Sequence, residues 1–174
     1  MKPNINTVGG LMPARGYNGQ TSRLTETIID SLVSSDSVAI EFGSLVGRDP
    51  ANAKCLRRCR LTDAVLGPVH RDPITFPANQ DGTVNFRQYA SVPFMRLGFM
   101  NLTPIENVNA DDGLVAIFDG GTGIFIGFGS TANPIDGNRR LVKGWKWETT
   151  TAANASEPGE ASGGMSSSVN YITY

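Results

Sequence analysis

The sequence predicts an all-β domain, built as a sandwich or a barrel, with an extended arm at its N-terminus. Short apolar segments recur along the chain, and several of them alternate with polar residues at a period of two. Turn-forming dipeptides stand where these segments stop, and the chain holds 20 Gly and 10 Pro. This composition suits short strands joined by tight turns better than it suits a helical bundle.

The first 20 residues predict the arm. Glycine and proline recur in this stretch, and its apolar side chains are scattered ones such as Leu11, Met12 and Tyr17. Such a segment cannot build a core by itself. We therefore expect residues 1–20 to be extended, and either disordered or ordered by contact with a neighbouring protein.

Residues 21–34 allow two interpretations. Leu24, Ile28 and Leu32 recur every four residues after Thr21 and Ser22, two possible N-caps, which favours a short helix. The high content of β-branched residues in the same stretch favours an extended segment. The sequence leaves both open.

Strands are expected from residue 38 onwards. Val38, Ile40 and Phe42 alternate with other residues before Gly43, which is typical of a half-buried strand. Further strands are predicted at 54–61, 64–70, 83–89, 92–100, 105–108, 114–119, 124–128, 139–147 and 169–174. The β domain should therefore cover residues 21–148. Residues 149–168 carry almost no apolar side chains and are expected to form an exposed loop, after which 169–174 completes the domain as a terminal strand.

Charge and hydropathy argue against two classes of partner. The net charge is −1, so no overall field would draw the protein to nucleic acid or to an anionic membrane. The most apolar stretch, residues 114–128, is interrupted by Asp119 and several glycines and does not resemble a membrane span. The first ten residues lack the apolar core of a secretory signal, so we expect the chain to be made and used without export.

Motifs for catalysis or metal binding are missing. His70 is the only histidine, and no nucleophile elbow accompanies it. Cys55, Cys59 and His70 fall short of the four ligands of a structural zinc site. If residues 54–61 form one strand, the two cysteine Cα atoms lie about 13 Å apart, too far for a disulfide. We expect free thiols, no metal, no cofactor and no catalytic residue.

Two further groups of residues, one aromatic and one basic, could form binding surfaces. Trp145 and Trp147 share one face of a predicted strand, where a core or subunit-interface role is favoured over a sugar-stacking platform. Arg57, Arg58 and Arg60 form a basic cluster, which at this net charge is expected to pair with carboxylates of a partner protein rather than with nucleic acid.

Four segments in order resemble the structural cement or decoration proteins of bacteriophage capsids. They are VAIEFGSLV at 38–46, LGPV at 66–69, YASVPFMRLG at 89–98 and LVAIF at 114–118. The similarity lies in the order of elements: a polar arm, a strand closing on Phe-Gly, a short strand, a longer strand ending in Gly, and a late apolar strand. It covers about residues 36–128, and the chain from Asn133 onwards matches less well.

The resemblance implies a jelly-roll-like β domain on the outside of an icosahedral phage head, located in the virion and assembled in the host cytoplasm. The implied partner is the major capsid protein of the tailed-phage fold, bound across subunit boundaries, and no catalytic residues come with the resemblance. We add the hypothesis of self-association as a dimer or trimer. The candidate capsid or subunit interface residues are Leu11, Met12, Arg15, Tyr17, Arg57, Arg58, Trp145 and Trp147.

Three alternatives stay open. The protein could be another virion β module, such as a tail or fibre component. It could be a carbohydrate-binding domain that uses Trp145 and Trp147. An enzyme centred on His70 is the least favoured, because the sequence offers that histidine no catalytic partners.

Overall fold

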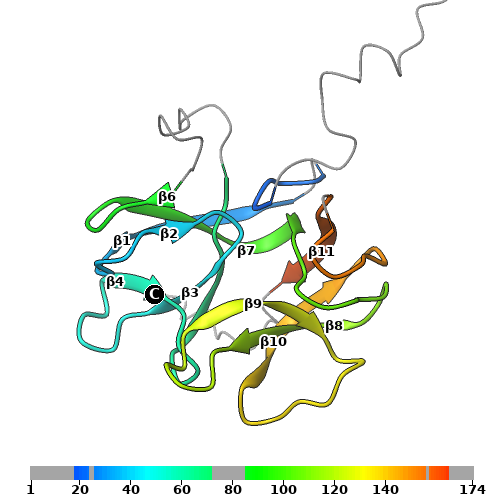
Figure 1. The fold of residues 1–174 in the computed structure, drawn as a ribbon. Coiled ribbons are helices and arrows are strands. Elements are labelled where there is room, and N and C mark those ends of the chain that lie inside the picture. Colours follow the sequence, from blue (N-terminus) through cyan, green and yellow to red (C-terminus); the bar gives the residue numbers. More distant parts are fainter. Residues whose placement is uncertain (1–17, 24–25, 72–84, 156, 165–174) are drawn as a thin grey trace, which may run out of the picture.

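A computed structural model describes residues 18–23, 26–71, 85–155 and 157–164 (Figure 1). These ranges contain strands, turns and bends and no helix, which confirms the all-β prediction. Nine strands form one sheet in the order β5-β3-β4-β1-β7-β11-β10-β8-β9, and β2 and β6 form a two-stranded sheet. The sheet is mixed, because β1 pairs with β4 in parallel while its other pairings are antiparallel.

The bounds of the strands follow the chain. They are β1 (Ile28–Ser34), β2 (Ile40–Glu41), β3 (Leu45–Arg48), β4 (Cys55–Arg58), β5 (Val65–Pro68), β6 (Asn85–Phe86), β7 (Ser91–Leu102), β8 (Gly113–Phe118), β9 (Phe125–Ser130), β10 (Arg139–Trp147) and β11 (Gly159–Gly164).

The long strand β7 organises the sandwich. Its first half pairs with β1 and its second half with β11, so it belongs to both halves of the sheet (Figure 1). The first half curls back onto β7 through an isolated bridge between Val69 and Phe94. The second half curls back onto the chain just after β7, through a bridge between Pro104 and Phe128. The result is two curled lobes that share one strand, in agreement with the predicted sandwich class.

Each lobe encloses its own apolar cluster. The first consists of Ile40, Phe42, Val46, Leu56, Val69, Phe86, Val92 and Phe94. The small β2–β6 sheet covers it, and Phe42 meets Phe86 edge to face with ring centroids 5.1 Å apart. The second and larger cluster is dominated by Phe118, Phe128, Trp145 and Trp147. Burial of these side chains supplies the main free energy for folding.

Residues 28–34 form a strand, which settles the ambiguity of that segment. β1 pairs with β7 from Ile28 to Val33, and this pairing favours the extended alternative. Ile29, Ser31 and Val33 are exposed, whereas Leu32 packs against the first cluster. The four-residue spacing that indicated a helix is therefore incidental, because tertiary pairing overrides weak local propensity.

The prediction of an exposed loop at 149–168 is wrong for its second half. β11 lies inside the sheet between β10 and β7, and Gly159, Ala161 and Gly163 are buried. Its small residues are a packing requirement, because a Cβ atom at Gly163 would lie 1.9 Å from Cε2 of Trp145. The strand β3 was also missed, and the predicted strand at 105–108 is reduced to a bridge between Val108 and Thr151. The predicted terminal strand 169–174 lies outside the described residues.

The domain begins earlier than predicted, because residues 18–20 are already part of it. Asn18 donates from Nδ2 to the Phe42 carbonyl over 2.9 Å and accepts from the Thr103 amide over 3.0 Å. Gly19 has a φ of 80°, and a Cβ atom there would lie 2.7 Å from the Gly43 nitrogen. The predicted arm boundary at residue 20 is therefore too late, and residues 1–17 lie outside the described residues.

Candidate functional site

The two tryptophans belong to the core. Trp147 is fully buried and Trp145 is 5% exposed. The Trp147 indole N–H donates to the Gly129 carbonyl over 2.9 Å, which satisfies its polar atom inside the second cluster. The core interpretation is confirmed. The capsid or subunit interface role predicted for both residues is wrong, and so is the sugar-stacking platform, because neither ring face reaches solvent.

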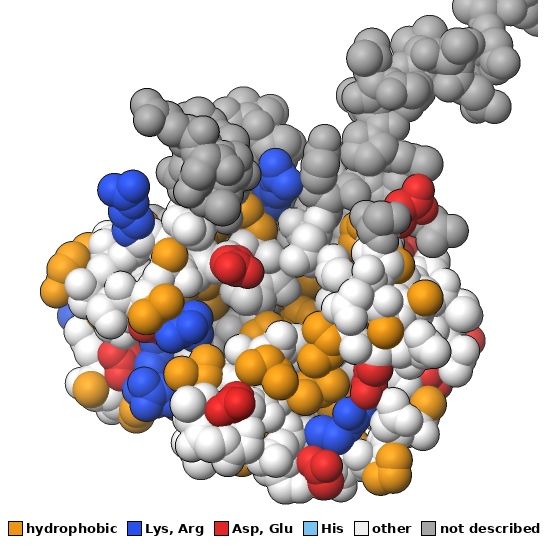
Figure 2. Space-filling view, in the orientation of Figure 1, with side chains coloured by type: hydrophobic (Ala, Val, Ile, Leu, Met, Phe, Trp, Pro, Cys, Tyr) orange, Lys and Arg blue, Asp and Glu red, His pale blue; other side chains and the backbone are white. Residues whose placement is uncertain are grey.

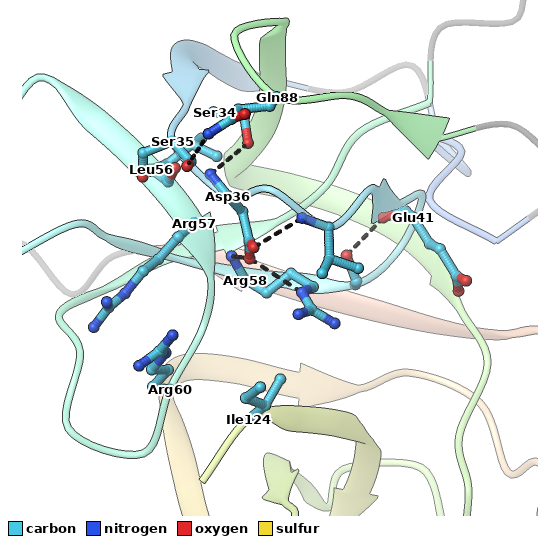
Figure 3. Close-up of polar contacts among 12 residues, drawn as sticks. Ser34, Ser35, Asp36, Glu41, Leu56, Arg57, Arg58, Arg60, Gln88 and Ile124 are labelled. Atoms are coloured by element: carbon cyan, nitrogen blue, oxygen red, sulfur yellow. Dashed lines mark hydrogen bonds and ion pairs between the residues drawn. The ribbon is translucent and has the colours of Figure 1, made fainter. Parts of the chain in front are cut away.

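Two of the three arginines of the predicted basic cluster pair within the chain, and Figure 3 shows the pair of Arg58 with Asp36. Arg57 of β4 makes two hydrogen bonds to Asp63, over 3.0 and 2.7 Å, and the Asp63 side chain is 2% exposed. Arg58 donates to Asp36 over 3.1 Å. Internal carboxylates therefore hold both arginines, and their role in a capsid or subunit interface stays a prediction.

These pairs shift the ionisation of their members. The side-chain hydrogen bond to Asp63 raises the pKa of Arg57. Burial alone would raise the pKa of Asp36, but hydrogen bonds from the Val38 amide and from Arg58 outweigh it and leave the pKa below its usual value. Both ion pairs thus join β4 to the loops that flank it and act structurally.

Arg60 differs from its two neighbours. Its residue is exposed, and within the described ranges its guanidinium forms no ion pair. Its backbone is fixed, because residues 59–61 pair with residues 123–125, where β9 begins. In Figure 2, Lys and Arg side chains gather on the side of the molecule that carries β3 and β4. Arg60 is the member of the predicted cluster that remains free to meet an external carboxylate.

An exposed corner that sequence reasoning missed lies beside Asp36. We call residues 37–38 and 87–89 the Tyr89 corner. Tyr89 is 76% exposed and Val38 is 50% exposed. Residues 88–89 are held to the end of β1, because the Tyr89 amide donates to the Ser34 carbonyl over 2.8 Å and Gln88 Nε2 donates to the Ser35 carbonyl over 3.1 Å. Figure 3 shows Gln88 beside Ser34 and Ser35.

The backbone at Tyr89 is strained. Its φ of 65° lies in the left-handed region, which a bulky aromatic residue rarely adopts. Strain of this kind persists where the surrounding structure enforces it, and it gathers at functional positions. The sequence carried no signal for this corner, because Tyr89 stood at the end of a predicted strand.

The histidine and the two cysteines that were considered for catalysis or metal binding belong to the fold of the domain. His70 Nε2 lies 2.9 Å from Thr21 Oγ1 and ties the start of the domain to the chain after β5. Cys55 and Cys59 are both free, as expected. Among the described residues, no group of three His, Cys, Asp or Glu side chains is placed to hold a metal ion. A search of the same residues for a helix able to cross a membrane finds none.

The predicted arm residues Leu11, Met12, Arg15 and Tyr17 lie outside the described ranges, so their interface role stays a prediction. The point from which they extend is fixed, because Asn18 and Gly19 are bonded to the domain.

Comparisons with known proteins bear on these surfaces. The model of a family described as structural cement protein (E217 gp24/Pam3 gp6) matches residues 5–160, from within the predicted arm to β11. A chain in the solved structure titled "The capsid of Myoviridae Phage XM1" has a similar fold, with a TM-score of 0.63 and 14% identity. The similarity covers 86% of this chain and 91% of that chain, and an identity this low supports the shared fold alone. No curated protein matches.

Proposed function

Because this chain belongs to the phage structural cement protein family, we propose that it binds the outer surface of an icosahedral phage head and stabilises the head by bridging major capsid protein subunits. The match of the family over residues 5–160 carries this proposal. Membership supports a capsid-associated, structural and non-enzymatic role in the virion. The outer position, the bridging and self-association as a dimer or trimer are parts of the proposal.

The physical role of such a protein is mechanical. DNA packaged inside a head loads the seams between capsid subunits, and a clamp across a seam adds interface area where separation would begin. A standard protein interface buries roughly 1,600 Å² in total. A compact β domain with an arm can reach that area, because an arm that becomes ordered on its partner wraps a large surface.

The arm is well placed to transmit force. Its last residues enter the domain at Asn18, which is hydrogen bonded to Phe42 and Thr103, and at Gly19, which receives a hydrogen bond from the Arg71 amide. The Gly19 amide also donates to the Asn101 carbonyl of β7 over 2.7 Å, so a pull on residues 1–17 would reach β7 directly. Leu11, Met12, Arg15 and Tyr17 supply the apolar, aromatic and cationic groups that interfaces favour.

We assign the second contact to the Tyr89 corner. Tyrosine is prominent among the residues that dominate binding energy at interfaces. Tyr89 is exposed, and its backbone is held in an unfavourable conformation. A tyrosine kept there despite its strain is better explained by contact with the capsid than by stability of the free domain.

The test compares binding to heads that lack the protein, measured by co-sedimentation and by cryo-electron microscopy. We expect deletion of residues 1–17 to weaken binding while the β domain stays folded. Tyr89→Asn should weaken binding about tenfold or more with stability unchanged or raised, because Asn tolerates the left-handed conformation.

Ile135→Asn is the matched control, since Ile135 is also exposed, at 52%, but lies on the loop between β9 and β10. It should bind as the parent protein does. Unchanged binding by both the deletion and Tyr89→Asn would overturn the two assigned contacts. Failure of the parent protein to bind heads at all would overturn the proposed function.

A further inference from the structure

The turn that carries Tyr89 belongs to a larger edge of its lobe, where three segments meet at Ser35. The Ser35 carbonyl accepts from Gln88 Nε2 over 3.1 Å, and the Ser35 hydroxyl donates to the Asp49 carboxylate over 2.6 Å. The Ser35 amide donates to the Leu56 carbonyl of β4 over 2.9 Å. Figure 3 shows Gln88, Ser35 and Leu56 close together. The turn of Tyr89 and the loop between β3 and β4 therefore lie on the same edge.

Three exposed cations stand on this edge, and we call Arg48, Lys54 and Arg87 the cationic rim. Arg87 begins the turn of Tyr89, which closes where the Ala90 amide donates to the Arg87 carbonyl over 3.1 Å. Arg48 ends β3 and Lys54 precedes β4, so these two flank the loop between the strands. Within the described ranges, none of the three side chains forms an ion pair.

The carboxylates of the same segments do not neutralise the rim. Asp36 is held by Arg58 over 3.1 Å, so this pair adds no net charge. Asp49 is only 9% exposed, and its carboxylate accepts from the Ser35 hydroxyl and, over 2.9 Å, from the Ala51 amide. The edge therefore presents an excess of positive charge to its surroundings.

This excess follows a division of charge along the whole chain. Residues 26–71 and 85–97 carry eight Lys and Arg against six Asp and Glu, whereas residues 98–155 and 157–164 carry four against eight. The net charge of −1 thus conceals two regions of opposite sign. A locally positive surface attracts a negative partner and speeds their encounter, even on a protein that is nearly neutral overall.

Tyr89 and the rim have complementary abilities. An exposed tyrosine offers a large contact area with a polar end, and cations beside it can pair with carboxylates. Building on the function proposed above, we propose that the Tyr89 corner and the cationic rim together bind an acidic surface of the major capsid protein. The rim draws the two surfaces together, and Tyr89 makes the contact that slows their release.

A second copy of the chain offers a poorer match for the rim, although its region 98–164 is acidic. Half of the carboxylates in that region already form ion pairs within the chain, namely those of Glu106, Asp111, Glu148 and Glu160. An ion pair that is already made leaves little net charge for a neighbour. The charges of the rim are therefore better matched by a different protein with unpaired carboxylates.

The test measures association and dissociation rates on immobilised heads that lack the protein. At about 50 mM salt, Lys54→Gln/Arg87→Gln should associate about threefold or more slowly than the parent, with its dissociation rate nearly unchanged. The difference should shrink at about 0.5 M salt, because salt screens exposed charges. Lys54→Glu/Arg87→Glu should associate more slowly still. Tyr89→Asn should instead act mainly by raising the dissociation rate.

Lys143→Gln is the control, since Lys143 is an exposed cation of β10 that forms no ion pair among the described residues. It should bind heads as the parent does, with the same salt dependence. Melting of the rim variants should match that of the parent, because the substitutions break no ion pair within the described ranges.

Three results would overturn the proposal while the parent still binds heads and the proposed function stands. The first is an unchanged association rate of the Gln double variant at low salt. The second is a Glu double variant that associates no more slowly than the Gln one, since this would show that the partner surface is not acidic. The third is self-association of the parent without heads, seen by sedimentation velocity and lost in the Gln double variant, which would assign the rim to a second copy. Failure of the parent to bind heads would overturn the proposed function and this proposal together.

Discussion

Trp147 donates its indole N–H to the Gly129 carbonyl over 2.9 Å inside the larger apolar cluster. This bond joins β10 to β9, two strands that each pair with β8 and not with each other. It therefore acts across the interior of the lobe, where the sheet ladder cannot. Tryptophan can make this link because its side chain is both large and a hydrogen-bond donor.

Trp147→Phe should lower the free energy of unfolding by about 2–4 kcal/mol. It leaves the buried Gly129 carbonyl without its donor and opens a cavity. Trp145→Phe is the comparison, since Trp145 is 5% exposed and makes no hydrogen bond to the described residues through its indole. Urea denaturation followed by circular dichroism measures both variants. Equal losses would show that the bond to Gly129 contributes nothing.

Gly163→Ala should destabilise the domain by roughly 1–3 kcal/mol, because it overpacks the contact between β11 and Trp145. A Cβ atom at this position would lie 1.9 Å from Cε2 and 2.0 Å from Cδ2 of the indole, so the ring has to move. Gly137→Ala is the matched control, since no atom lies within 4 Å of a Cβ atom there. Thermal unfolding of the two variants should differ clearly, and identical melting would contradict the packing role of β11.

Asp63→Ala should cost about 3–5 kcal/mol, because it leaves Arg57 partly buried without a counter-ion. The Asp63 carboxylate also accepts from the Arg60 amide over 3.0 Å, so its loss also loosens the turn after β4. Asp111→Asn removes the charge that pairs with Lys146 and tolerates the left-handed φ of 70° at this position. Because the Asp111 side chain is 84% exposed, this variant should cost less than about 1 kcal/mol. A similar loss in both variants, measured by urea titration, would refute the structural role assigned to the Arg57 pair.

The sequence predicted the fold class because strand patterns and turn dipeptides are local signals. β10 was placed at its observed bounds, 139–147, because its alternation ends on two large aromatic residues. β11 was missed because GEASGG has no apolar pattern. Its burial depends on the indole of Trp145, which lies on the neighbouring strand. When a side chain on a neighbouring strand dictates which residues fit, the strand itself need show no apolar periodicity in its sequence.

The candidate site was less predictable for a related reason. Arg57 and Arg58 look like an external basic cluster until the fold brings Asp63 and Asp36 to them. Tyr89 is an ordinary strand residue in sequence, and only its φ of 65° and its exposure distinguish it. Charge pairing and backbone strain are products of tertiary structure, so local patterns could not reveal them.

Alkylation should distinguish the two cysteines. Burial raises the pKa of Cys59 to about 12, and its side chain is inaccessible, whereas Cys55 on β4 is partly exposed. Because the thiolate is the reactive form, iodoacetamide at pH 8 should leave Cys59 unmodified in the native protein. Mass spectrometry should find it labelled only after unfolding in denaturant. Native labelling of Cys59 at the rate of Cys55 would contradict its place in the core.

Glu106 should make stability fall in acid. Its carboxylate accepts from Arg139 over 2.9 and 2.6 Å and from the Ser130 amide over 2.7 Å. The hydrogen bond from Arg139, aided by the one from Ser130, lowers the pKa of Glu106 below its usual 4.5 and outweighs the opposing effect of burial. A carboxyl group with a depressed pKa contributes stability that is fully present above its unfolded-state pKa and is lost as the pH falls through the folded one.

Glu106→Gln should therefore be less stable than the parent at pH 7, by about 1–3 kcal/mol, because the neutral amide binds Arg139 less strongly. Between about pH 5 and pH 3 the variant should lose less stability than the parent, since it has no proton to gain at this position. Urea denaturation at several pH values measures both slopes. Some acid sensitivity should remain, because the pKa of Asp36, held down against burial by hydrogen bonds from Val38 and Arg58, is also lowered. Equal losses by the two proteins over this range would show that the Glu106–Arg139 pair does not couple folding to pH.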